Sequence, residues 1–196
     1  RPFVGEYPNY TRTANRHDYS IKPPLTMLDQ LKEAGLSVLA VGKIYDIFAG
    51  MGITDTVRTH DNAEGIRMLL ERMDMDFEGL CFVNLVDFDM VYGHRNDVDG
   101  YAKALAYFDS QLPAVLEKLR EDDILIITAD HGCDPSTPST DHSREYVPML
   151  AYGPKIRKSN NLGTRQSYAD IAATVLEYFE VVSMVAGESF LKDILQ

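Results

Sequence analysis

Apolar positions along the chain change between a helical period and short continuous runs. Residues 26–34 (TMLDQLKEA) carry apolar side chains at helical spacing and stop at Gly35, a residue that readily takes the left-handed conformation that ends many helices. Residues 37–42 (SVLAVG) form a short β-branched and apolar run, which is typical of a strand buried on both faces. The pattern therefore predicts a helix followed by a buried strand.

The same alternation continues toward the C-terminus. Further helices are predicted over 62–73, 100–119 and 167–178, and further strands over 79–86, 124–128 and 147–152. We expect Asn62 to cap the first of these helices, and Pro113 to kink the second or to begin a new helical segment. Pro148 indicates either that the last strand lies at an edge of the sheet or that the proline stands at the start of the strand. Helices between strands imply right-handed crossovers, so the predicted fold class is α/β, with a mostly parallel sheet flanked by helices on both faces.

Composition narrows the classes of protein that fit this pattern. A chain of 196 residues that is 45% hydrophobic can bury a core as one compact unit. Its formal net charge of −11 opposes binding to nucleic acid or to anionic lipid, so neither is expected as a partner. No apolar run approaches the roughly 20 residues that cross a bilayer. The two cysteines, Cys81 and Cys133, form neither a disulfide framework nor a CxxC motif, and a cytoplasmic location is expected.

Carboxylates and imidazoles follow two of the predicted strands. The first group comes after strand 79–86 and comprises Asp87, Asp89, His94, Asp97 and Asp99. The second group comes after strand 124–128 and comprises Asp130, His131, Asp134, Asp141 and His142. The carboxyl ends of parallel strands meet at one edge of a sheet, so the two groups should face each other. An isolated group of this kind is usually a solvated turn, but together they favour a metal site. Mixed imidazole and carboxylate ligands suit manganese or zinc better than magnesium or calcium.

Two metal ions would serve phosphoryl transfer, which also requires cationic side chains that hold a phosphate. Lys43 ends the first strand at the same edge of the sheet. Arg1 and Arg16 lie in an opening segment that is locally basic, and arginine binds phosphate through two parallel hydrogen bonds. From sequence alone a solvated charged tail is an equal interpretation of that segment.

Three runs carry a resemblance to a known family. They are 84–97 (NLVDFDMVYGHRND), 127–154 (ITADHGCDPSTPSTDHSREYVPMLAYGP) and 1–24 (RPFVGEYPNYTRTANRHDYSIKPP). They closely resemble the phosphopentomutases, a family within the alkaline phosphatase superfamily. The resemblance implies an alkaline-phosphatase-like core and an enzyme with two Mn²⁺ ions and a sugar bisphosphate activator. Such an enzyme interconverts ribose or deoxyribose 1-phosphate with the 5-phosphate through a phosphothreonine.

The resemblance also implies roles for individual residues. Asp89, His94 and His142 would hold one metal, and Asp130 and His131 would belong to the other, with Asp87 as a neighbour that is not a ligand. Arg1, Arg16 and Lys43 match positions expected to bind the pentose phosphate substrate or to lie around the phosphorylated threonine.

The chain departs from the family at its front. Family members begin with a further metal-binding aspartate, the nucleophilic threonine and most of a cap domain, and none of these is present. We therefore expect residues 1–23 to be a remnant of the cap domain and return linker, and residues 24–196 to be the C-terminal part of the catalytic core. Such a fragment would still bind one metal ion, would have an empty or weak second site and would be inactive alone.

Two alternatives stay open at this stage. Cofactor-independent phosphoglycerate mutase has a corresponding loop that resembles Asp-Met-Val-Gly-His, whereas this chain reads Asp89-Met-Val-Tyr-Gly-His94, one residue longer. The other alternative is a non-catalytic metal-binding fragment.

Overall fold

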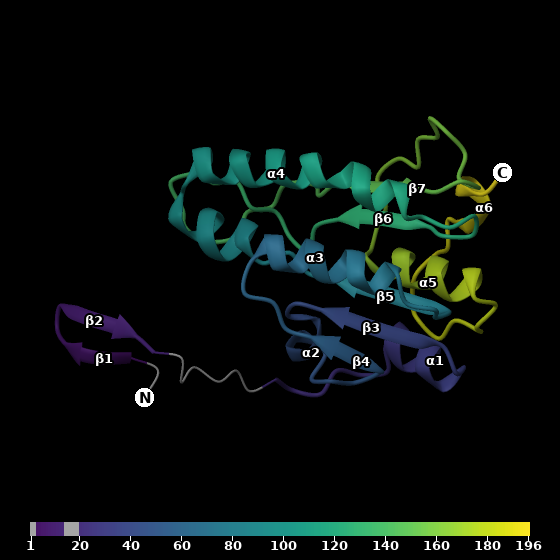
Figure 1. Ribbon diagram of the computed structural model, residues 1–196, viewed down its shortest axis with the longest axis horizontal. Helices are drawn as coiled ribbons and strands as arrows, with labels where there is room; N and C mark the ends of the chain where they lie inside the picture. The colour runs from purple at the N-terminus through teal and green to yellow at the C-terminus, as the bar shows by residue number, and fades with distance from the viewer. Residues whose placement is uncertain (1–2, 14–19) are drawn as a thin grey trace.

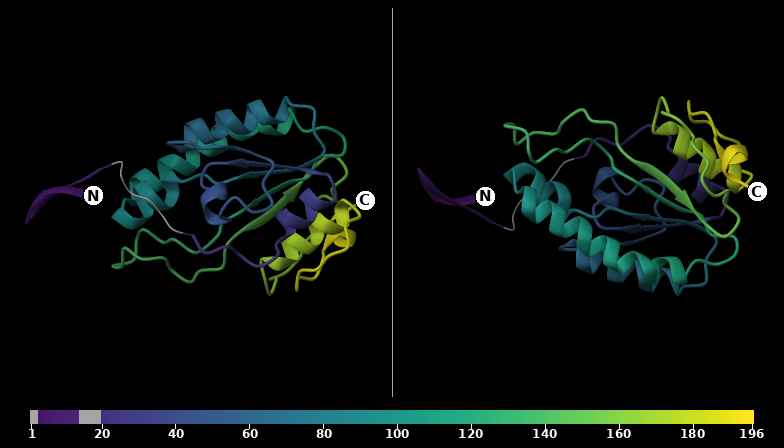
Figure 2. Two further views of the ribbon diagram at one scale, coloured as in Figure 1. Left: turned by 90° about the horizontal axis from the view of Figure 1, so that it is seen from below. Right: turned by 90° about the horizontal axis from the view of Figure 1, so that it is seen from above.

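The computed structural model describes residues 3–13 and 20–196. Its centre is a parallel sheet in the order β4 (Asp55–Val57), β3 (Ser37–Val41), β5 (Gly79–Val83), in which Leu39 of β3 lies opposite both Asp55 and Cys81. Helices α3 (Asn62–Met73) and α4 (Val98–Glu117) lie on one side of this sheet, while α1 (Met27–Glu33) and α5 (Ala169–Tyr178) lie on the other (Figures 1 and 2). The predicted α/β class, with helices on both faces of a parallel sheet, is confirmed.

Local capping explains where two helices begin. The backbone N–H and the hydroxyl of Thr26 both donate to the Asp29 carboxylate at 2.8 Å, which fixes the start of α1. Helix α3 is capped by Asp61, whose side chain accepts from the backbone N–H of Glu64 at 2.8 Å. The expectation that Asn62 is the cap is therefore wrong by one residue.

Helix α4 is one continuous element that contains Pro113. The alternative that Pro113 begins a new helical segment is therefore wrong. The helix starts two residues earlier than predicted because the Asp97 carboxylate accepts from the backbone N–H of Gly100 at 2.9 Å.

The C-terminal strands differ from the prediction. Strand β6 (Leu125–Thr128) pairs antiparallel with β7 (Met149–Tyr152), and Pro148 comes immediately before β7. Within the described residues β6 has no hydrogen-bonded pairing with β5, so the parallel sheet stops at β5. Strand β3 is buried, whereas β5 is only half-buried along its length, as is β6 up to its exposed last residue. Both β5 and β6 thus carry an edge that no strand among the described residues pairs with.

The remaining elements are short. They are the antiparallel hairpin β1 (Phe3–Glu6) and β2 (Asn9–Arg12), the helix α2 (Ile44–Ile47), the π-helical turn η1 (Phe88–Tyr92), the 3₁₀ turn η2 (Gly93–Arg95) and the helix α6 (Leu191–Ile194). The hairpin stands apart from the sheets (Figure 1) and exposes Phe3, Tyr7 and Tyr10.

Two apolar clusters form the core. The larger joins α1, β3, α2 and α5 through Leu28, Leu31, Val38, Ala40, Ile44, Ile53 and Leu176. The smaller surrounds the chain end and contains Ile156, Phe190, Leu191 and Ile194. Neither cluster includes the loops after β5 and β6. These loops carry the carboxylates and imidazoles that the sequence singled out. In the part of the chain that the structure describes, no helix combines the length and apolar character that crossing a membrane requires.

Candidate metal centre

Four predicted side chains meet at the carboxyl ends of β5 and β6. Asp89 lies in the π-helical turn η1, a type of distortion that recurs at functional sites, and His94 lies in η2 directly after it. His131 follows β6, and His142 lies at the end of the loop 132–143, which an antiparallel bridge between Gly132 and Ser143 closes at its base. The prediction that the two loops face each other agrees with this arrangement.

The Asp89 carboxylate is the centre of the cluster. Its Oδ1 atom lies 3.1 Å from Nε2 of His94 and 3.3 Å from Nε2 of His142. The ring of His142 stacks on that of His131 with a centroid separation of 3.6 Å and on that of His94 at 5.0 Å. Single ligand atoms from Asp89, His131 and His142 all lie within 4.8 Å of one another. One carboxylate and three imidazoles therefore converge on a small volume.

Hydrogen bonds to the backbone fix the tautomers of two of these histidines. His94 Nδ1 lies 2.5 Å from the carbonyl oxygen of Thr140, and His131 Nδ1 lies 3.0 Å from that of Gly132. Because a carbonyl oxygen only accepts, each of these Nδ1 atoms carries the proton and donates. In a neutral ring the Nε2 atom then carries the lone pair, as in histidines that bind a metal through Nε2.

The same contacts explain why this cluster suits a cation. Among the described residues, Asp89 Oδ1 is buried and has no hydrogen-bond partner, although two imidazole nitrogens face it. A carboxylate oxygen opposite an unprotonated nitrogen is a contact between two acceptors, which costs free energy unless a proton or a metal lies between them. Protonating both His131 and His142 would stack two like charges face to face at 3.6 Å. A bound metal ion would pair the carboxylate oxygen with the unprotonated nitrogens and would not require both rings to be protonated.

The other predicted residues lie around this centre or away from it. Asp130 is exposed, with its Oδ1 3.6 Å from Nε2 of His131. Asp87 is engaged elsewhere, by hydrogen bonds with Asn62. Lys43 is half-buried at the N-cap of α2, and none of the described contacts joins it to the histidines. Arg1 and Arg16 lie outside the described residues.

Close packing between the two loops was not visible in the sequence. A Cβ atom at Gly93 would lie 2.2 Å from Sγ of Cys133, so only glycine allows the approach. Burial raises the pKa of the Cys133 thiol, and the neighbouring Asp89 carboxylate raises it further, which keeps the sulfur neutral beside the cluster. Thr140 was also missed, because it contributes a backbone carbonyl and no side-chain signal.

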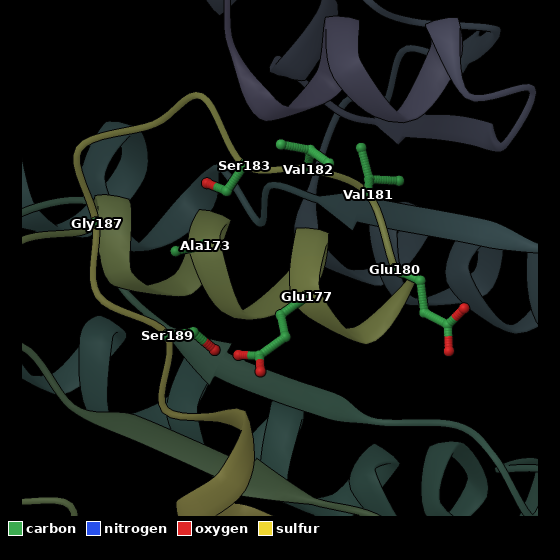
Figure 3. A pocket seen from close by; sticks show the side chains of 8 residues that line it. All are labelled: Ala173, Glu177, Glu180, Val181, Val182, Ser183, Gly187 and Ser189. Atoms are coloured by element: carbon green, nitrogen blue, oxygen red, sulfur yellow. The ribbon is translucent and has the colours of Figure 1, made fainter.

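A pocket elsewhere on the molecule does not share residues with this cluster. It lies beside α5 and the segment that follows it (Figure 3), and it is lined by Ala173, Glu177, Glu180, Val181, Val182, Ser183, Gly187 and Ser189. It is open and two of its lining residues are acidic. It does not resemble the cationic site that a phosphate would require.

Comparison with known proteins defines the class. The model of the metalloenzyme superfamily matches residues 5–183, and the chain belongs to that superfamily. The chain is 68% identical over 197 aligned residues to the phosphopentomutase of Lachnoclostridium phytofermentans, covering 100% of this chain and 50% of that protein. It is 60% identical to the phosphopentomutase of Caldanaerobacter subterraneus subsp. tengcongensis (99% of this chain, 50% of that protein) and 59% identical to that of Acetivibrio thermocellus (100% and 50%).

The resemblance to phosphopentomutases that the three sequence runs indicated is therefore confirmed. The chain spans about half the length of the curated relatives it matches.

Proposed function

We propose that this chain forms the metal-binding half of a phosphopentomutase, an isomerase that interconverts ribose or 2-deoxyribose 1-phosphate with the corresponding 5-phosphate. The observation that carries the proposal is the buried Oδ1 atom of Asp89, which faces Nε2 of His94 and of His142 without a hydrogen-bond partner. Similarity to phosphopentomutases over the whole chain supports the choice of reaction. Both cysteines are free, which fits a reducing cytoplasm as the place of action.

The ligand set fits a divalent transition metal. Two atoms that each lie about 2.1 Å from one ion at roughly 90–110° are about 3.0–3.4 Å apart, and the contacts of Asp89 with His94 and His142 fall in that range. We assign these three residues to one Mn²⁺ and assign Asp130 and His131 to a second. When bound, the ions would neutralise charge on a transferring phosphoryl group and stabilise the attacking and leaving oxygens.

The protein side chains have separate tasks in this scheme. The carbonyl oxygens of Thr140 and Gly132 accept from Nδ1 of His94 and His131, so Nε2 is the nitrogen of each ring that would bind a metal ion. Lys43, at the N-cap of α2, together with Arg1 and Arg16, would hold the phosphate of the substrate or of a sugar bisphosphate activator.

The nucleophilic threonine, a further metal-binding aspartate and most of the sugar-binding cap would come from polypeptide that corresponds to the other half of the relatives. In this proposal residues 24–196 are the C-terminal part of the core and residues 1–23 belong to the cap and its return linker. Two features support it: β5 and β6 each have an edge that no described strand pairs with, and the β1–β2 hairpin exposes aromatic side chains. Each presents surface that further chain would cover.

Metal titration tests the site. We expect the chain to bind about one tight equivalent of Mn²⁺ or Zn²⁺ at neutral pH, and His142→Ala to lose it. His60→Ala is the matched control, because His60 is 92% exposed and pairs with Glu64 on α3, outside the cluster. No binding by the unmodified chain, or equal binding by His142→Ala, would show that these loops do not form a metal site.

The reaction needs its own assay. A polypeptide that contains both halves should convert ribose 1-phosphate to ribose 5-phosphate in the presence of Mn²⁺, and His142→Ala in that polypeptide should abolish the conversion. Activity on phosphoglycerate in place of pentose phosphates would replace this proposal with the phosphoglycerate mutase alternative.

A further inference from the structure

We infer that Asn96 is a positioning residue, which holds the loop 132–143 against η2 and so brings His142 to Asp89 and His94. The inference rests on the proposed metal site. It concerns a residue that binds neither metal nor substrate in that proposal.

Asn96 connects the two loops through its side-chain amide. Its Nδ2 atom donates to the carbonyl oxygens of Thr137, at 2.5 Å, and of Ser139, at 3.1 Å. Both amide protons are therefore used on carbonyls of one short segment. His94, two residues earlier, donates to the carbonyl of Thr140 from its Nδ1 atom. Three hydrogen bonds thus run from residues 94–96 to the segment that leads directly into His142.

These bonds matter because the other hydrogen bonds of that segment are local to the loop: Thr137 donates to the carbonyl of Asp134, and the backbone N–H of Asp141 donates to Ser139 Oγ. The base of the loop is closed by the Gly132–Ser143 bridge and by Ser143 Oγ, which accepts from the backbone N–H of Asp134 at 2.9 Å. Residues 138–142, in contrast, are all exposed and belong to neither apolar cluster. Without burial, hydrogen bonds to a fixed neighbour decide where such a segment lies.

The backbone of Asn96 explains how its amide reaches the loop. Asn96 has φ 53° and ψ 33°, in the left-handed region, and its backbone N–H donates to the carbonyl of Gly93 at 3.1 Å. Asparagine adopts this conformation more readily than other residues with a side chain, and glycine adopts it at least as easily. Asn96→Gly therefore removes the amide without straining the backbone. The variant separates the hydrogen bonds of the side chain from the left-handed conformation of the backbone.

The test measures metal affinity and local motion together. Co²⁺ binding, followed by its visible absorption, should weaken about 10-fold to 100-fold in Asn96→Gly, as when groups that orient metal ligands are lost. In the metal-free chain, hydrogen–deuterium exchange should become faster in residues 137–142 and stay unchanged in α4 and β6. The matched control is Asn160→Gly, which removes an exposed amide that donates to the carbonyl of Asp193 at 2.6 Å and should alter neither measurement.

A second variant, Asn96→Asp, checks that a loss of Co²⁺ affinity does not come from a folding defect of Asn96→Gly. Asn96→Asp keeps the size and the left-handed tolerance but replaces the donating amide with a carboxylate that faces two carbonyl oxygens. It should weaken Co²⁺ binding at least as much as Asn96→Gly. Unchanged affinity in both folded variants would overturn the inference, as would weaker affinity without faster exchange in 137–142. Absence of Co²⁺ binding by the unmodified chain would instead refute the proposed site, and this inference with it.

Discussion

Asn62 and Asp87 exchange two hydrogen bonds across 25 residues of sequence. The backbone N–H of Asn62 donates to Oδ2 of Asp87 at 2.8 Å, and the backbone N–H of Asp87 donates to Oδ1 of Asn62 at 2.9 Å. The pair ties the first residue of α3 to the chain that leaves β5, two residues before Asp89. Asp87 therefore supports the metal cluster from outside it.

Replacing Asn62 should destabilise the fold. Asn62 is 4% exposed, and Asn62→Ala leaves the part-buried N–H of Asp87 without its acceptor. The substitution also removes the buried Nδ2 atom of Asn62, which has no partner among the described residues, so we expect a net loss of about 0.5–1.5 kcal/mol in the free energy of unfolding. Urea denaturation measures it. Asn161→Ala removes only an exposed hydrogen bond from the backbone N–H of Gly163 and should change stability by less than about 0.5 kcal/mol. Equal effects in the two variants would mean that the exchanged pair contributes no stability.

Asp89→Asn separates metal binding from folding. The amide keeps the shape but loses the charge, so Mn²⁺ affinity should fall at least about tenfold. The metal-free protein should be no less stable than the unmodified chain, because an amide N–H can donate to the free Nε2 atoms that the carboxylate oxygen faces without a proton. Calorimetric titration and thermal denaturation measure the two effects. Asp99→Asn, an exposed position in the first turn of α4, should change neither. A large loss of metal-free stability in Asp89→Asn would contradict the acceptor–acceptor contact.

Gly93→Ala tests the close contact between the two loops. The φ of Gly93 is −60°, so alanine fits the backbone, but its Cβ would lie 2.2 Å from Sγ of Cys133. We expect thermal denaturation to show a loss of about 1–3 kcal/mol, the usual effect of overpacking. Removing the sulfur should relieve the clash, so Gly93→Ala with Cys133→Ala should be more stable than Gly93→Ala alone. If the double variant were less stable, the contact would not be the cause.

The helices and buried strands were predictable because their apolar periods are strong. Residues 62–73 match α3 in full, and 37–42 contains β3. Strand β4 was missed because three residues, of which only Val57 is apolar, show no period. The direction of β7 was also missed, since whether a strand runs parallel or antiparallel depends on the path of the preceding loop and leaves no local pattern.

The candidate site divides in the same way. The proximity of Asp89, His94, His131 and His142 was predictable because strand ends place polar side chains at one edge of a parallel sheet. Asn96, Gly93 and Thr140 were missed. Asn96 acts on backbone carbonyls, Gly93 acts by lacking a side chain and Thr140 acts through its own carbonyl, so none has a residue-type signature. Contacts of this kind depend on how the two loops approach each other in space, which the sequence pattern does not show.

Asp170 should make stability depend on pH in the acid range. The Asp170 side chain, 7% exposed, accepts from the backbone N–H of Glu188 and from Nε of Arg165, each at 2.9 Å. The hydrogen bond from Glu188 and then the Arg165 guanidinium lower the pKa of this carboxyl below its ordinary value of 3.8. A lowered pKa in the folded state means that the stabilisation is fully present above about pH 4–5 and is lost as the pH falls through the folded-state value.

Asp170→Asn isolates that contribution from other carboxylates. At pH 7 the variant should be less stable by about 1.5–3 kcal/mol, the range for hydrogen bonds to a charged group. Since only the unmodified chain loses the ionised carboxylate on acidification, the difference in the free energy of unfolding between the two proteins should shrink below about pH 4. Urea denaturation at several pH values between 7 and 2.5 measures it. Lys192→Gln, on the exposed side of α6, is the control and should give a small difference that does not depend on pH in this range. A difference between Asp170→Asn and the unmodified chain that stayed constant down to pH 2.5 would show that the charge of Asp170 does not stabilise the fold.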